Sequence, residues 1–255
     1  MKKKFIPSFT IAFFIVVLPA RAQIVNIESA RMQSDTVGWM GGAGASVSLS
    51  QNTQQVFGVD MAAHLQYKTS NDKGLWLILG HYGFLEGGHI KYISNRFLHL
   101  RYNRKINEWL RWEIFGQELD NLITQIDSRF LVGTGPRFKI AKSKTLRLYA
   151  ASLVMYEQEK EITTPVIRHK DIRSSSYISF TFTPRENVEV ISTTFYQPLL
   201  KKLADFRILN ELTFKVKASK HFALSLNWDY LNDRFPAGVA PRETYRLTAG
   251  FTYEM

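Results

Sequence analysis

The chain has 255 residues, no cysteine and a formal net charge of +11. Without cysteine it can form neither a disulfide framework nor a cysteine-based metal site, so hydrogen bonds and packing must stabilise it. The positive charges are spread along the sequence, which favours a solvated surface and argues against a nucleic-acid site. After the first residues, no segment approaches the roughly 18 consecutive apolar residues of a membrane-spanning helix.

Residues 1–22 have the pattern of a secretory signal peptide. Lys2, Lys3 and Lys4 precede an apolar run that ends at Pro19, and Ala20-Arg21-Ala22 fits the cleavage site. A retained membrane anchor is the alternative, but the apolar run is shorter than the ~20 residues of a span. Cleavage would remove three lysines and one arginine, which lowers the formal charge from +11 to +7. We therefore expect residues 23–255 to form one exported domain, with 23–37 as a periplasmic lead-in.

From Trp39 onward, apolar and polar residues alternate with a period of two, as in strands with one apolar face. The alternation is clearest in 57–68, 220–231 and 243–253, and the last strand is expected to close a barrel with the first. The pattern predicts an all-β fold, a single transmembrane antiparallel β-barrel of about twelve strands. The expected strands are 39–49, 57–68, 76–84, 90–102, 110–117, 125–139, 144–157, 171–183, 187–198, 205–217, 220–231 and 243–253.

The lengths of the connections between these strands depend on the end of the barrel at which they lie. If the first strand runs outward, the connections on the periplasmic side are all short turns. The two longest connections, 158–170 and 232–242, both fall on the outer side. Short periplasmic turns and longer outer loops are typical of bacterial outer-membrane barrels.

A soluble β protein with its apolar face packed inward is the main alternative. Two features argue against it. Aromatic residues lie near strand ends on the apolar side, as in interfacial girdles, and the opposite side carries many charges that require water or partners. The aromatic residues are Trp39, Tyr67, Trp76, Tyr82, Tyr92, Tyr102, Trp112, Trp228, Tyr230, Tyr245 and Tyr253. The charged or ionisable residues are Asp60, His64, His99, Arg101, Arg111, Glu113, Arg129, Arg137, Arg147, Glu211 and Arg246.

Several short motifs between Val25 and Arg137 resemble a bacterial family of unknown function that includes the salt-induced outer-membrane protein. The most specific are Phe97-Leu98-His99-Leu100-Arg101-Tyr102 and Trp112-Glu113-Ile114-Phe115-Gly116-Gln117, followed by the segment 129–137. The resemblance implies an outer-membrane β-barrel with no assigned activity. It supplies no catalytic residues.

The candidate functional residues form a polar strip that three neighbouring strands are expected to place on one inner wall. A basic strip with an embedded carboxylate could bind a small anionic solute or a lipid headgroup through charge-assisted hydrogen bonds. The alternative, which we favour, is an internal Arg–Glu ladder that stiffens a narrow lumen. The strip consists of His99, Arg101, Arg111, Glu113, Gln117, Arg129 and Arg137.

Enzymatic and metal-binding interpretations have little support in the sequence. None of the six histidines has a serine two residues later, the spacing known in twelve-stranded outer-membrane phospholipases. A hydrolase of another geometry could pair His64 with Ser46 or Ser48. No histidine motif with metal-ligand spacing occurs. Gly133 and Gly135 are expected to let a strand bend or let a large side chain cross the lumen.

We therefore expect a monomeric barrel in the outer membrane of a Gram-negative bacterium, surrounded by its lipids. It would have no catalytic residues, metal or cofactor. The leading functional hypothesis is a small pore or an envelope protein that responds to osmotic or salt stress. The alternative is a lipid-modifying enzyme with its site on the barrel wall.

Overall fold

The computed structural model describes residues 37–51, 54–219 and 222–253. The predicted signal peptide and nearly all of the lead-in lie outside these residues. The described residues form twelve antiparallel strands in one sheet, and each strand pairs with the next along the chain. The strands are β1 Gly38–Gln51, β2 Gln55–Lys68, β3 Gly74–Gly87, β4 Ile90–Lys105, β5 Leu110–Asn121, β6 Ile126–Lys142, β7 Leu146–Glu161, β8 Arg168–Arg185, β9 Val188–Leu199, β10 Lys202–Lys217, β11 Phe222–Asp233 and β12 Glu243–Tyr253.

All twelve expected strands are present, and most extend further than the alternation indicated. For example, β5 continues to Asn121 and β7 to Glu161, each four residues beyond its expected end. These added residues are mostly polar and break the two-residue pattern, although their backbones still pair with the neighbouring strands. The two longest connections, 162–167 and 234–242, lie at the same end of the sheet, as predicted.

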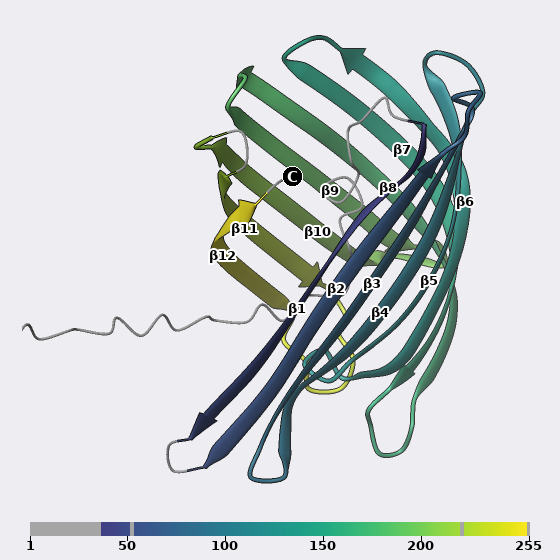
Figure 1. Cartoon of the computed structure of the whole chain (residues 1–255). Helices are drawn as coiled ribbons and strands as arrows, with labels where there is room; N and C mark the ends of the chain where they lie inside the picture. The colour runs from purple at the N-terminus through teal and green to yellow at the C-terminus, as the bar shows by residue number, and fades with distance from the viewer. Residues whose placement is uncertain (1–36, 52–53, 220–221, 254–255) are drawn as a thin grey trace, which may run out of the picture.

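The sheet curves around an interior, with β1 to β5 on one side and β8 to β12 on the other (Figure 1). β12 pairs with β11 and β1 pairs with β2. Among the described residues β1 and β12 do not pair, so the expected closure by the last strand is not seen there. Interior side chains instead connect strands that are not neighbours in the sheet. No part of the chain that the structure describes forms a helix able to span a membrane.

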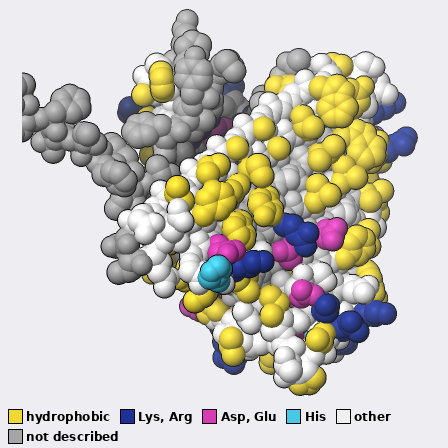
Figure 2. All heavy atoms as spheres, turned by 60° about the horizontal axis from the view of Figure 1, so that its bottom comes forward, with side chains coloured by type: hydrophobic (Ala, Val, Ile, Leu, Met, Phe, Trp, Pro, Cys, Tyr) yellow, Lys and Arg dark blue, Asp and Glu magenta, His cyan; other side chains and the backbone are white. Residues whose placement is uncertain are grey.

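The outward wall is mainly apolar, and many ionic side chains are enclosed in the interior. Leu98 is 55% exposed and Leu226 41%, whereas Arg101 is 4% exposed and Glu113 0%. Figure 2 shows hydrophobic side chains covering much of the wall, with charged side chains gathered toward one end. This orientation is that of a transmembrane barrel, and the soluble alternative is wrong.

Aromatic residues gather on the outward wall at the end where the short turns lie. Trp39 packs against Tyr67, with ring centroids 4.8 Å apart, and Trp76 packs against Tyr102 at 4.5 Å. The strand register places these four residues in one row across β1 to β4. Such a row suits the interface between hydrocarbon and water, where the apolar part of each ring contacts lipid and its polar group is hydrated.

A hydrophobic core fills part of the barrel interior. Its residues come from the inward positions of seven consecutive strands, β5 to β11, and each is at most 6% exposed. Buried apolar area of this kind excludes water from that part of the lumen. The core consists of Phe115, Leu131, Ala151, Leu153, Met155, Tyr177, Phe195, Leu209 and Leu231.

Gly133 makes room for a ring of this core, as predicted. A Cβ atom at position 133 would lie 2.5 Å from the Phe115 ring and 2.9 Å from the Met155 side chain. We expect Gly133→Val to lower the free energy of unfolding by roughly 1–3 kcal/mol, because overpacking forces the ring and backbone to shift. Urea unfolding followed by tryptophan fluorescence would measure this loss.

Gly116→Val is the matched control, because a Cβ at Gly116 meets nothing within 4 Å. Equal losses for the two variants would show that the effect reflects strand propensity and not contact with Phe115.

Candidate functional site

Four residues that we call the inner cluster join β4, β5, β6 and β8 inside the barrel. The Glu113 carboxylate accepts hydrogen bonds from Arg101 Nη1 at 2.9 Å and from the Tyr177 hydroxyl at 2.8 Å. Arg137 Nε lies 3.8 Å from the same carboxylate. Tyr177 is on β8 and Glu113 on β5, so their hydrogen bond bridges strands that are not neighbours in the sheet. Glu113 is therefore the common partner of two buried arginines.

Aromatic rings cover the two arginines of the inner cluster. The guanidinium of Arg101 lies 5.1 Å from the centre of the Phe115 ring, and that of Arg137 lies 4.0 Å from the Tyr149 ring. Cation–π contacts of this kind are stronger where water is excluded. The two cations are thus held by both the carboxylate and the ring faces.

A second group, which we call the outer cluster, lies nearer the long connections. Its centre is Glu157, which receives Arg207 Nη1 at 2.7 Å and Arg173 Nε at 3.3 Å. Arg207 also reaches Glu159 at 3.2 Å, and Arg129 Nε donates to Glu159 at 2.6 Å. Arg207 connects β10 with β7 across the interior. The cluster consists of Arg129, Glu157, Glu159, Arg173, Asp205, Arg207 and Asp233.

The predicted polar strip is therefore divided. Arg101, Glu113 and Arg137 lie in the inner cluster, whereas Arg129 lies in the outer one. His99 and Gln117 form a separate buried pair, with His99 Nδ1 at 3.0 Å from Gln117 Oε1. Arg111 is half-buried near the short-turn end, where the register places it between Lys105 and Arg137.

The prediction from sequence missed half of this interior. Glu157 and Glu159 on β7, Arg173 on β8 and Arg207 on β10 are all at least 95% buried. The sequence does indicate that Glu157 and Glu159 face inward, because they have the same two-residue spacing as the inward residues of β5. The alternation in the second half of the chain is less clear, and only Arg147 and Glu211 are predicted to face inward on β7 and β10.

The interior has two unlike halves. Most inward residues of β5 to β9, with Arg207 and Leu209 of β10, are buried by the core and the two clusters. Most inward residues of β1, β2 and β12 are small or half-exposed, including Ser46, His64 and Thr248, although Gln66 of β2 is buried. A Cβ atom at Gly44 or Gly250, which have the same inward parity, would meet nothing within 4 Å. Among the residues that the structure describes, open space therefore lies beside β1 and β12.

The connection after β11, residues 234–242, folds back over the end of the interior (Figure 1). Ala237 is buried against Leu119 and Ile126 of the opposite wall. The Gly238 amide donates to Glu161 Oε2 at 3.1 Å. The connection therefore covers part of the mouth at this end.

Two candidate chemical sites have unfavourable geometry among the described residues. His64 lies opposite Gly42, and Ser46 lies opposite Asp60, so the register does not pair His64 directly with either serine of the hydrolase hypothesis. Glu159, Glu161 and His169 place their ligand atoms within 4.8 Å of one another, a proximity that the sequence did not reveal. Because Glu159 already faces two arginines of the outer cluster, this trio is poorly suited to a cation.

At the short-turn end, lysines hold two carboxylates in the ionised form. The hydrogen bond from Lys68 lowers the pKa of Asp72, and the hydrogen bond from Lys105 lowers the pKa of Glu108. Lys105 Nζ lies 3.8 Å from Asp72 and 2.5 Å from Glu108, which links two adjacent turns. These pairs are exposed to solvent, so each adds little to stability.

A family model described as "Protein of unknown function, DUF481" matches residues 43–255. The chain belongs to this family. The match confirms the membership in a barrel family of unknown function that the sequence motifs indicated, and it extends through β12. No curated protein matches this DUF481 chain.

Solved outer-membrane barrels share the fold of this DUF481 protein. The translocator domain of autotransporter NalP from Neisseria meningitidis has a TM-score of 0.50 at 8% identity, covering 90% of this chain and 92% of that one. The NanC porin has a TM-score of 0.49 at 9% identity, covering 85% of this chain and 99% of that one. At such low identity the likeness to the NalP translocator domain shows the fold alone: an outer-membrane β-barrel.

Proposed function

We propose that this protein is a narrow passive pore whose water-filled passage runs beside β1, β2 and β12. The observation that carries the proposal is the open space at Gly44 and Gly250, opposite a half of the interior that is filled. A twelve-stranded barrel encloses only a modest lumen. With one half occupied by side chains, the remaining passage would admit small solutes only.

Charges of both signs line this proposed passage. His81 Nε2 lies 2.9 Å from Asp60 Oδ2, and Asp229 pairs with Arg246. Paired charges give a weaker field than a ring of one sign, so selectivity between small anions and cations would be low. A role in osmotic or salt stress rests on the family resemblance alone, and the chain would act as a monomer in outer-membrane lipid.

Single-channel conductance in planar bilayers tests the proposal. We expect the wild-type protein to show small steps, and Gly44→Trp or Gly250→Trp to lower the conductance severalfold by filling the passage. Gly116→Trp is the matched control, because Gly116 is equally unobstructed but has outward parity. It should leave the conductance unchanged.

Two results would contradict the pore. One is the absence of conductance steps from correctly folded wild-type protein. The other is an equal loss of conductance in the Gly44 and Gly116 variants, since a solute path along β1 cannot depend on the lipid-facing wall. Turnover of phospholipid by the non-conducting protein would instead favour the enzyme hypothesis.

A further inference from the structure

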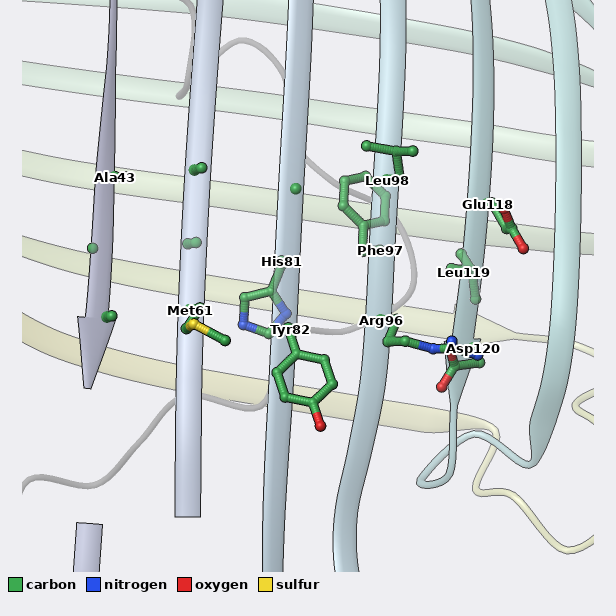
Figure 3. Close-up of a pocket in the computed structure, with 15 residues that line it drawn as sticks. Ala43, Met61, His81, Tyr82, Arg96, Phe97, Leu98, Glu118, Leu119 and Asp120 are labelled. Carbon is green, nitrogen blue, oxygen red and sulfur yellow. The ribbon is translucent and has the colours of Figure 1, made fainter. Parts of the chain in front are cut away.

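A groove of about 750 Å³ lies across β1 to β5 and is separate from the two interior clusters (Figure 3). The strand register aligns its lining residues in rows that run across the sheet. One row contains Ala43, Ala63 and Gly80, and it continues through Leu98 to Glu118. Ten of the fifteen lining residues have outward parity, in two rows, and the other five belong to the inward row between them, so the groove runs along the lipid-facing wall between the two outward rows.

Small side chains create this depression in the wall. One row away toward the short turns, β2 and β3 carry Leu65 and Ile78 where the groove has Ala63 and Gly80, whereas β4 carries a leucine in both rows. Large apolar residues such as these normally cover the lipid-facing band of a barrel. Replacing them with alanine and glycine leaves a trough with an apolar floor.

The length of the trough suits one acyl chain. Adjacent strands lie about 4.8 Å apart, so the four steps from β1 to β5 span roughly 19 Å. The hydrocarbon core of a bilayer is about 30 Å thick and holds two leaflets, so one acyl chain spans about 15 Å.

The charges at the β5 end indicate the type of headgroup. Arg96 Nε lies 2.5 Å from Asp120 Oδ1, and the Arg96 side chain is 71% exposed. Exposed Glu118 is next to Asp120 on the same outward face. The guanidinium can bind a phosphate, and a carboxylate beside it can bind a cation. Because the two carboxylates outnumber the guanidinium, a headgroup with several negative charges is disfavoured.

We propose that this groove binds one zwitterionic phospholipid. Its acyl chain lies over Ala43, Ala63 and Gly80, its phosphate accepts hydrogen bonds from Arg96, and its ammonium group pairs with Glu118. The proposal does not depend on pore activity, because the groove and the passage lie on opposite faces of the sheet.

Native mass spectrometry of the detergent-purified, delipidated full-length protein tests this. We expect one phosphatidylethanolamine to be retained per barrel after incubation with that lipid, and phosphatidylglycerol to be retained severalfold less. Ala63→Phe should abolish retention by filling the trough. Gly116→Phe, on the same wall but outside the groove, should retain lipid like the wild type, and heat-modifiable mobility in gels would show that both variants fold.

Glu118→Gln provides a second test that leaves the trough intact. It should reduce the preference for phosphatidylethanolamine over phosphatidylglycerol. The proposal is overturned if wild type retains no phosphatidylethanolamine or if Ala63→Phe retains as much as wild type. It is also overturned if the protein selects a phosphorylated glycolipid instead, or if the groove is occupied by a second copy of the chain, seen as a dimer that Ala63→Phe dissociates.

Discussion

Glu113→Gln is expected to lower the free energy of unfolding by about 3–5 kcal/mol, because it leaves buried arginines without a compensating charge. Arg101 and Arg137 both face the Glu113 carboxylate in the inner cluster, where that side chain is fully buried. A neutral amide keeps the shape but not the charge. Urea unfolding of the barrel in lipid vesicles, followed by tryptophan fluorescence, would measure the loss.

Two variants separate this effect from weaker ones. Tyr177→Phe removes one hydrogen bond to the same carboxylate and should cost roughly 1.5–3 kcal/mol. Asp127→Asn removes the charge from an exposed pair with Lys160 at 2.5 Å and should cost about 0–1 kcal/mol. A loss for Glu113→Gln no larger than that for Asp127→Asn would mean that water reaches the inner cluster.

Shortening the 234–242 connection is expected to raise single-channel conductance severalfold. This connection covers part of the mouth by burying Ala237 against the opposite wall. It is held by the hydrogen bond from Gly238 to Glu161 and by the Arg234 amide, which donates to the Phe206 carbonyl at 3.0 Å. Replacing residues 235–240 with Asn-Gly would remove the cover and leave the strands intact. Planar-bilayer recordings would measure the change.

Val239→Ser is the matched control for the shortened connection. Val239 is 90% exposed, so its side chain contributes little to the cover. We expect its conductance to equal that of the wild type. Unchanged conductance in the shortened variant would show that the connection does not limit the passage.

The strand pattern could be predicted because a strand exposes its two faces to different surroundings. In residues 57–68, the outward side chains face lipid and the inward side chains face the lumen. Apolar and polar residues therefore alternate along the segment, and this alternation predicts the strand. The ends of β5 and β7 lie outside the lipid band, and there polar residues occupy both faces of the strand. The alternation of apolar and polar residues therefore stops before the backbone pairing with neighbouring strands does.

The sequence alone determined the fold class, the number of strands, the apolar character of the outward face and the end with the longer connections. All of these depend on residues near one another in the chain. The tertiary structure decided which charges meet, because Glu113 and Tyr177 are 64 positions apart and Arg207 and Glu157 are 50. It also decided that one half of the interior is filled and that the lipid-facing wall has a groove. Those features depend on the sheet's curvature and register, which bring distant residues together and which no local pattern encodes.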